Sequence, residues 1–277
     1  MKKVKHGGVF TAIFSIISIG YIFPILLVFI NSFKKKAYIS RKPFDIPTGK
    51  MYVGLENYFR GIKQANFLEG AKWSTVITVG SVFLIILCTS MCAWYIVRVK
   101  NALTKAIYYL CLFAMIVPFQ MEMFTLSKLA HSLGLNTPWG LWIIYLGFGA
   151  GLSVFMFTGF VKSIPVEIEE AAMIDGCNPL QTFFGVVLPV LKPTCVTVAI
   201  LQTMWIWNDY LLPYLVLDLK KCVTIPIAVQ YLEGGYGSVD MGAMMGVLVL
   251  AIIPIIIFYL FCQRYIIEGV VAGAVKG

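Results

Sequence analysis

A length of 277 residues would ordinarily accommodate one or two globular domains, but the composition excludes a soluble protein. Apolar residues make up 60% of the chain, charged residues only 13%, and the mean hydropathy is +0.86. Soluble domains carry about 25% charged residues. Too few charges remain to hydrate a surface of this size, which argues against a soluble enzyme, a disordered tail and a nucleic-acid partner. The net charge of +9 instead fits lysine and arginine in loops beside anionic lipid.

The hydropathy pattern predicts an all-α membrane protein with six transmembrane helices. Each span needs about 20 apolar residues. The six stretches are residues 9–33, 74–97, 106–123, 139–161, 194–217 and 241–261. The first is longer than the apolar core of a signal peptide, so we expect an uncleaved membrane helix. An even number of spans places both termini on one side, but Lys and Arg divide almost equally between the two sides, and the positive-inside rule leaves the orientation open.

Residues 34–72 form a long polar connection after the first stretch. Within it, residues 55–68 have the pattern of an amphipathic surface helix. The run Lys34-Lys35-Lys36 is expected to be a charge cluster that faces solvent or lipid. In the last stretch, Gly242 and Gly246 have the four-residue spacing that lets two helices approach closely, so we expect a packing face there.

The connection over residues 162–193 contains a short helix with a signal at each end. Pro165 suits the first helical position, because its missing N–H needs no partner there. Glutamates in the early turns favour the positive end of the helix dipole. Gly176 can adopt the left-handed conformation that ends helices. A second helical stretch is expected over residues 178–187, after which Leu188-Pro189 and Pro193 redirect the chain into the membrane.

The same connection carries a recognisable motif. Glu170-Ala171-Ala172, then three residues, Gly176, nine residues, Val186, one residue and Leu188-Pro189 resembles the EAA loop of ABC importer permeases. Val186 stands where that family prefers Ile, and Cys177 where Ala is commoner. The resemblance implies the type I ABC importer permease fold, with residues 162–193 as a cytoplasmic coupling loop and both termini in the cytoplasm. It also implies the following contacts with a separate ATPase: Glu169, Glu170, Ala171, Ala172, Asp175, Gly176, Leu188 and Pro189.

Further motifs are similar to those of carbohydrate permeases of the maltose type. They are Pro118-Phe119-Gln120, Leu133-Gly134-Leu135-Asn136-Thr137, Trp207-Asn208-Asp209-Tyr210 with Pro213, and the end of the chain from Gly269 to Gly277. The resemblance implies one permease domain over residues 1–277, an extracytoplasmic segment at 34–72 and a cytoplasmic tail at 264–277. In that tail Gly273, Lys276 and Gly277 would contact the ATPase. The resemblance is weakest over residues 34–75.

Asp209 is the only acidic residue well inside an apolar stretch, about two-thirds of the way across the fifth span. A carboxylate there is costly and by default faces a partner or a water-filled cavity. Its aromatic and amide neighbours are of types that stack on sugar rings and bond to hydroxyls. The candidate substrate-pathway residues are therefore Trp205, Trp207, Asn208, Asp209 and Tyr210. Lining of a pathway, direct sugar contact and packing against a neighbouring subunit all remain open.

Gln120 and Glu122 follow the predicted break at Pro118, and they are either part of a gate or a solvated helix end. The chain contains no phosphate-binding loop of the Gly-x-x-x-x-Gly-Lys-Ser/Thr type and no metal-ligand cluster. We therefore expect no catalytic residue, cofactor or metal on this chain, and expect ATP and Mg²⁺ on the partner ATPase. We therefore expect that this chain is a transport subunit and not an enzyme.

The resemblance implies a membrane-spanning subunit of an ATP-driven sugar importer in the cell membrane, with an oligosaccharide as the expected substrate. Its partners would be a second, homologous permease, an ATP-binding cassette dimer, an extracytoplasmic sugar-binding protein and membrane lipid. Two alternatives remain: an ABC importer permease for a non-sugar solute, and an ion-coupled secondary transporter. The second predicts repeated broken helices and several membrane charges, and Asp209 is the one firm candidate for such a charge.

Overall fold

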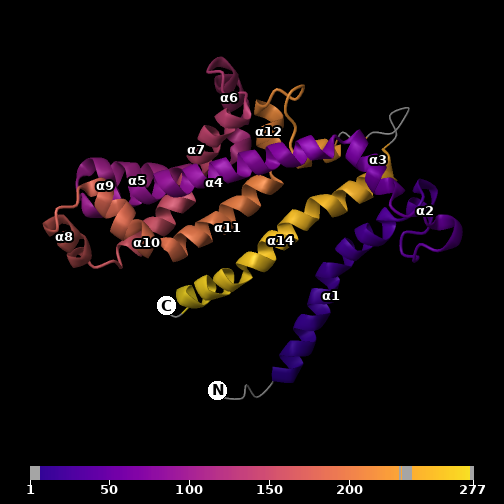
Figure 1. The fold of residues 1–277 in the computed structure, drawn as a ribbon, viewed down its shortest axis with the longest axis horizontal. Coiled ribbons are helices and arrows are strands. Elements are labelled where there is room, and N and C mark those ends of the chain that lie inside the picture. The colour runs from indigo at the N-terminus through magenta and orange to yellow at the C-terminus, as the bar shows by residue number, and fades with distance from the viewer. Residues whose placement is uncertain (1–6, 231, 233–238, 275–277) are drawn as a thin grey trace. The chain divides into compact units, whose positions relative to one another are not determined.

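The computed structural model describes residues 7–230, 232 and 239–274 (Figure 1). Four helices in this part of the chain are long and apolar enough to cross a membrane. They are α1 (Gly7–Ser32), α4 (Phe67–Arg98), α7 (Pro138–Val161) and α14 (Met241–Ala274). They confirm four of the six predicted stretches, although α4 begins earlier and α14 continues further than the hydropathy pattern indicated.

The third predicted stretch, residues 106–123, is not one straight helix. It is divided between α5 (Ala102–Ala114) and α6 (Phe119–Ser132), which meet at an angle of 107°. Pro118 stands immediately before α6, where it lacks an N–H and disfavours helical geometry in the residue before it. The two helices together are long and apolar enough for one bent span, and the predicted break at Pro118 is confirmed.

The fifth predicted stretch, residues 194–217, is also interrupted. α11 (Lys192–Asn208) ends at Asp209, whose backbone is extended, and α12 (Leu211–Val216) follows. Pro213 has no N–H to donate to the carbonyl of Asp209, so the helical hydrogen-bond ladder cannot continue through this point. Asp209 therefore occupies a helix break and not a helix interior.

The remaining helices are short. They are α2 (Lys36–Arg41), a 3₁₀ turn (Gly49–Met51), α3 (Glu56–Gln64), α8 (Val166–Ile174), α9 (Pro179–Thr182), a π-helical turn (Phe183–Val187), α10 (Leu188–Val190) and α13 (Ile225–Gln230). α3 corresponds to the first part of the amphipathic helix predicted at 55–68. The chain divides into two compact units, one made of Met1–Gly70 with Ile227–Ile256 and the other of Ala71–Pro226 with Ile257–Gly277.

In the first unit, a buried lysine organises the segment that follows α1. Lys34 is 0% exposed, and its ammonium group donates to the carbonyls of Lys42 (2.8 Å) and Pro43 (3.0 Å). Burial lowers the pKa of Lys34, and the nearby Asp45 partly offsets this shift. The expected solvent- or lipid-facing charge cluster is therefore wrong for Lys34, because backbone carbonyls replace water around its ammonium group.

The small-residue face predicted on the last span packs against α3. A Cβ atom added to Gly242 would meet Asn57, and one added to Gly246 would meet the backbone of Asn57. At the same contact Arg60 on α3 forms an ion pair with Asp240, just before α14, at 2.9 Å. The predicted packing face is confirmed, and its partner is a short helix of the 34–72 segment.

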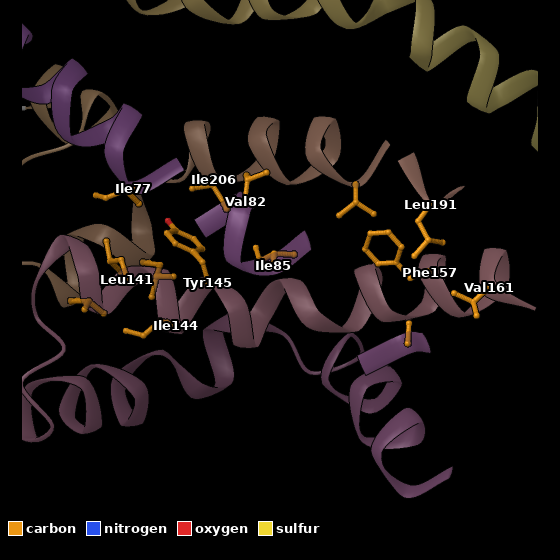
Figure 2. Packing of buried hydrophobic residues seen from close by; sticks show 14 of the residues in the cluster. Ile77, Val82, Ile85, Leu141, Ile144, Tyr145, Phe157, Val161, Leu191 and Ile206 are labelled. Atoms are coloured by element: carbon orange, nitrogen blue, oxygen red, sulfur yellow. The ribbon is translucent and has the colours of Figure 1, made fainter. Parts of the chain in front are cut away.

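In the second unit, α4, α7 and α11 share a buried apolar core (Figure 2). Tyr145 and Phe157 of α7 are both fully buried in it, and Phe157 points towards Leu191. Lipid is as apolar as these side chains, so association of the helices depends on close packing. Small residues permit it: a Cβ atom on Gly80 would clash with the indole of Trp142, whose Nε1 donates to the Val76 carbonyl at 3.1 Å.

Gly140, in the first turn of α7, gives a direct test of this packing. A Cβ atom there would clash with the backbone carbonyl of Leu135, which cannot swing away as a flexible side chain could. We expect Gly140→Ala to destabilise the protein by roughly 1–3 kcal/mol, the usual cost of overpacking. The measurement is the midpoint of thermal unfolding in detergent. Gly147→Ala is the matched control on the same helix, because its Cβ atom would meet nothing within 4 Å; equal midpoints for the two variants would contradict the prediction.

Candidate functional site

The predicted coupling loop contains a helix with well-defined ends. α8 begins at Val166, and Pro165 occupies the position before it with extended backbone angles (φ −57°, ψ 134°). Pro165 is therefore one residue outside the helix, not its first residue as predicted. Glu167 and Glu169 lie in the first turn, where the positive end of the helix dipole favours carboxylates.

The end of α8 is a Schellman turn built on Gly176. Gly176 has φ +89°, its N–H donates to the Met173 carbonyl at 3.1 Å, and the Cys177 N–H donates to the Ala172 carbonyl at 3.0 Å. These two bonds satisfy carbonyls that the helix end would leave unpaired. Asp175 is the last residue before this turn. The predicted terminating role of Gly176 is confirmed.

The next helix begins immediately and is capped reciprocally. The Asn178 side chain accepts from the Gln181 N–H at 2.9 Å, and the Gln181 side chain accepts from the Asn178 N–H at 2.8 Å. α9 then continues through the π-helical turn into α10, where Leu188 is half-buried against the core and Pro189 is exposed. The chain turns by 75° between Val190 and Lys192 before α11. The helical path therefore continues through Leu188-Pro189, and the change of direction comes after it.

α8 presents two different faces. Glu169 is 3% exposed and Ala172 is half-buried, whereas Glu170 and Ala171 are exposed. Apolar side chains also lie on the outer surface, and Ile174 reaches 86% exposure. The exposed apolar side chains of α8 are Val166, Ile168, Met173 and Ile174. An outward face that mixes carboxylates with large apolar groups is typical of a contact surface for another protein.

The inward carboxylate of Glu169 is held by α4. Arg98 Nη2 lies 2.6 Å from Glu169 Oε1, Arg98 Nε lies 3.0 Å from both carboxylate oxygens, and Trp94 Nε1 donates to Oε2 at 2.9 Å. Arg98 Nη2 also donates to the Ile164 carbonyl at 3.0 Å. The exposed Glu170 and the buried Glu169 are neighbours in sequence but have different surroundings.

A groove of about 1420 Å³ lies beside this contact. Its walls come from the end of α4, the start of α5, the end of α7 and α8, and they include Arg98, Glu169 and Glu170. Lys162 lies at its edge with its ammonium 6.0 Å from the centre of the Tyr108 ring. The groove is therefore lined by α8 on one side and by the ends of the membrane helices on the other.

The break in the fifth span is held by Asp209. Its Oδ1 accepts from the N–H groups of Leu211 (3.0 Å) and Leu212 (3.4 Å), and its Oδ2 accepts from the Tyr145 hydroxyl at 2.9 Å. The Trp205 ring lies edge-on to Tyr145, with 5.4 Å between the ring centres. Both carboxylate oxygens are thus used to cap α12 and to join it to α7.

The other predicted pathway residues lie around this break. Trp205 and Asn208 are exposed, Trp207 is half-buried, and Tyr210 stacks on Tyr214 with 5.2 Å between ring centres. Gln120 is exposed and Glu122 half-buried in the first turn of α6, a helix that packs against α12. In the predicted tail, Gly273 lies within α14, whereas Lys276 and Gly277 lie outside the described residues.

With this geometry in place, the family can be assigned. Residues 86–271 match the family of binding-protein-dependent transport system inner membrane components. The chain belongs to this family. This permease is 37% identical to the probable starch degradation products transport system permease protein of Thermoanaerobacterium thermosulfurigenes, over 94% of each chain. It is 35% identical to the multiple sugar-binding transport system permease protein of Streptococcus mutans, over 91% of each chain.

The fold has a counterpart in a solved structure of a bacterial ABC transporter involved in the import of the acidic polysaccharide alginate. The TM-score is 0.79 at 20% identity, and the match covers 94% of this permease and 95% of that chain. The permease therefore has the type I ABC importer fold and is a multi-pass membrane protein.

Sequence reasoning missed the partners of the key polar groups. Trp94 and Arg98 hold Glu169, Tyr145 holds Asp209, and Gln202 on α11 donates to Ser153 on α7 at 3.2 Å. These partners are 49 to 75 residues away in sequence from the groups they bind. One signal was available: Arg98 and Gln202 are polar residues at the end of, or inside, apolar runs, where a buried partner is the usual explanation.

Proposed function

We propose that this permease is one of the two membrane-spanning subunits of an ATP-driven importer for carbohydrate, with an oligosaccharide as the preferred substrate. The observation that carries the proposal is α8, a short helix that Arg98 holds near its start and a Schellman turn closes at its end, and whose outer face exposes Glu170 and Ile174. Similarity over more than nine-tenths of the chain to permeases named for starch degradation products and for multiple sugars supports the substrate class.

In this proposal α8 docks on a separate ATPase, which binds ATP and Mg²⁺ and performs the hydrolysis. Closure of the ATPase pair moves α8, and the permease pair changes from inward-open to outward-open, accepting sugar from an extracytoplasmic binding protein. A short helix that is closed at its C-terminus and held by Arg98 is suited to this task, because it transmits displacement that a flexible loop would absorb. The loop at 162–193 and both termini then lie in the cytoplasm, and the segment at 34–72 lies outside.

The substrate pathway in this proposal passes the break in the fifth span. Trp205, Trp207 and Tyr210 offer ring faces and Asn208 offers an amide, the groups that bind sugar rings and hydroxyls. Asp209 has its two oxygens bonded to protein donors, so we assign it the task of holding the break open. Gln120 and Glu122, on the helix packed against α12, are the candidate gate.

The test is purification of the permease from its native membrane in mild detergent, followed by identification of the proteins retained with it. We expect an ATP-binding cassette protein and a second permease. Glu170→Ala should weaken retention of the ATPase, because it alters the exposed face, while Glu122→Ala is an acidic control in another element and should not. A chain that purifies alone and transports in vesicles without ATP would support the secondary transporter. ATP-driven uptake of a non-sugar solute would retain the coupling and reject the substrate class.

A further inference from the structure

Two side chains of α4 bind one carboxylate of α8, and their geometry fixes how α8 is oriented. Glu169, Arg98 and Trp94 form a cluster that we name the α4–α8 clamp. Arg98 and Trp94 lie one helical turn apart on α4 and approach the same carboxylate, which is 3% exposed. The planar guanidinium uses two nitrogens on the carboxylate and one of them also on the Ile164 carbonyl.

Such an arrangement fixes orientation as well as distance. Two nitrogens of one planar group on one carboxylate define the angle between the partners, which a lysine ammonium cannot do. Successive residues on a helix point about 100° apart. Holding Glu169 inward therefore determines that Glu170 points outward, and a rotation of α8 about its axis would pull the carboxylate away from Arg98.

The helix that carries Arg98 and Trp94, α4, is long and uninterrupted. α4 extends over 32 residues without an internal proline, which is about 48 Å at 1.5 Å per residue. Near its other end, the Ser74 hydroxyl accepts from the Ile225 N–H at 2.9 Å, and the Val76 carbonyl accepts from Trp142. A displacement of α8 that is transferred to Arg98 can therefore reach contacts near the opposite side of the membrane.

From these observations we propose that Arg98 is a positioning residue, which makes α8 and α4 move as one body and so transmits the displacement of the coupling helix across the membrane. The inference rests on the proposed function, because it presupposes that an ATPase moves α8. In this inference α4, the second membrane span, carries the movement of α8 through Arg98 and Trp94.

The experiment reconstitutes the complete complex, with its ATPase and binding protein, in proteoliposomes. The measured quantity is sugar imported per ATP hydrolysed, for the wild type, Arg98→Lys, Glu169→Gln and the double variant. We expect each single variant to lower this ratio by roughly tenfold, within the range of coupling changes caused by residues that contact neither ligand. The double variant should be no worse than either single variant, because the two residues act as a unit.

Matched controls separate positioning from loss of charge. Glu56→Gln removes an exposed carboxylate on α3, outside the coupling loop, and Lys100→Gln removes an exposed cation two residues beyond Arg98. Both should retain the wild-type ratio. Retention of the ATPase subunit on purification is measured in parallel. A ratio within twofold of wild type in assembled Arg98→Lys and Glu169→Gln complexes would overturn the inference.

If Arg98→Lys does not assemble, Trp94→Phe decides, because it removes one hydrogen bond and retains the aromatic ring. A lowered ratio in assembled Trp94→Phe complexes supports the clamp, and an unchanged ratio rejects it. Failure of the proposed function gives a different result: the wild-type complex itself would then import no sugar in response to ATP.

Discussion

Gly176→Ala is expected to lower sugar uptake about tenfold while leaving the permease in the membrane. Gly176 has φ +89°, and a left-handed backbone costs an L-residue roughly 1–2 kcal/mol, which is about a factor of ten in an equilibrium constant. The added Cβ atom would meet nothing within 4 Å, so the whole cost lies in the backbone. Relief of the strain would break the bonds from Gly176 and Cys177 to the end of α8. The measurement is uptake together with ATP hydrolysis by the reconstituted complex.

Gly185→Ala is the matched control for this prediction. Gly185 lies nine residues further along the same loop, its Cβ atom would also meet open space, and its φ is not in the left-handed region. We expect near-normal uptake for this variant. Equal uptake by the two variants would show that the left-handed turn is not needed for coupling.

Asp209→Ala is expected to reduce uptake more strongly than it reduces assembly. It removes the acceptor for the N–H groups of Leu211 and Leu212, a cap worth about 1 kcal/mol. It also leaves the buried Tyr145 hydroxyl without this acceptor, which costs roughly a further 1–3 kcal/mol. The break between α11 and α12 should then change its angle and disturb the side chains of Trp205 and Trp207. Uptake and the yield of assembled complex are measured side by side.

Asp209→Asn distinguishes the two roles that a carboxylate could have here. An asparagine oxygen can still accept from Leu211 and Leu212, so a residue that only holds the break should tolerate the change. Uptake by Asp209→Asn should then lie close to wild type, and Tyr145→Phe should resemble a mild form of Asp209→Ala. Uptake by Asp209→Asn as low as that of Asp209→Ala would instead show that the pathway needs the negative charge.

The parts of the structure that depend on local signals could be predicted from the sequence. The end of α8 at Gly176 follows from the conformational freedom of glycine, and four of the spans follow from unbroken apolar runs. The packing face at Gly242 and Gly246 was also visible as a spacing. In each case the residues that determine the feature lie within a few turns of one another.

The parts that depend on distant partners could not be predicted. Hydropathy treats Lys34 as a charge and therefore predicts that it is exposed. Its burial depends on the carbonyls of Lys42 and Pro43, which surround the ammonium group only in the folded segment. The sequence pattern placed Asp209 in a helix interior. Nothing in the neighbouring residues indicates that the hydroxyl of Tyr145, 64 residues earlier, donates a hydrogen bond to its carboxylate. In the sequence, Arg98 is only one of several charges near the end of a span. Its contact with Glu169 is visible only in the folded structure.

The hydrogen bonds on both sides of Gly176 have a consequence for the affinity of α8 for a partner. The hydrogen bonds that close α8 and open α9 all lie within the loop, so α8 has its shape before any partner arrives. Ordering a residue costs roughly 1–2 kcal/mol, so a disordered nine-residue segment would lose on the order of 10 kcal/mol on docking. A preformed helix avoids most of that loss. In the proposed docking on an ATPase, a small contact surface can therefore bind tightly.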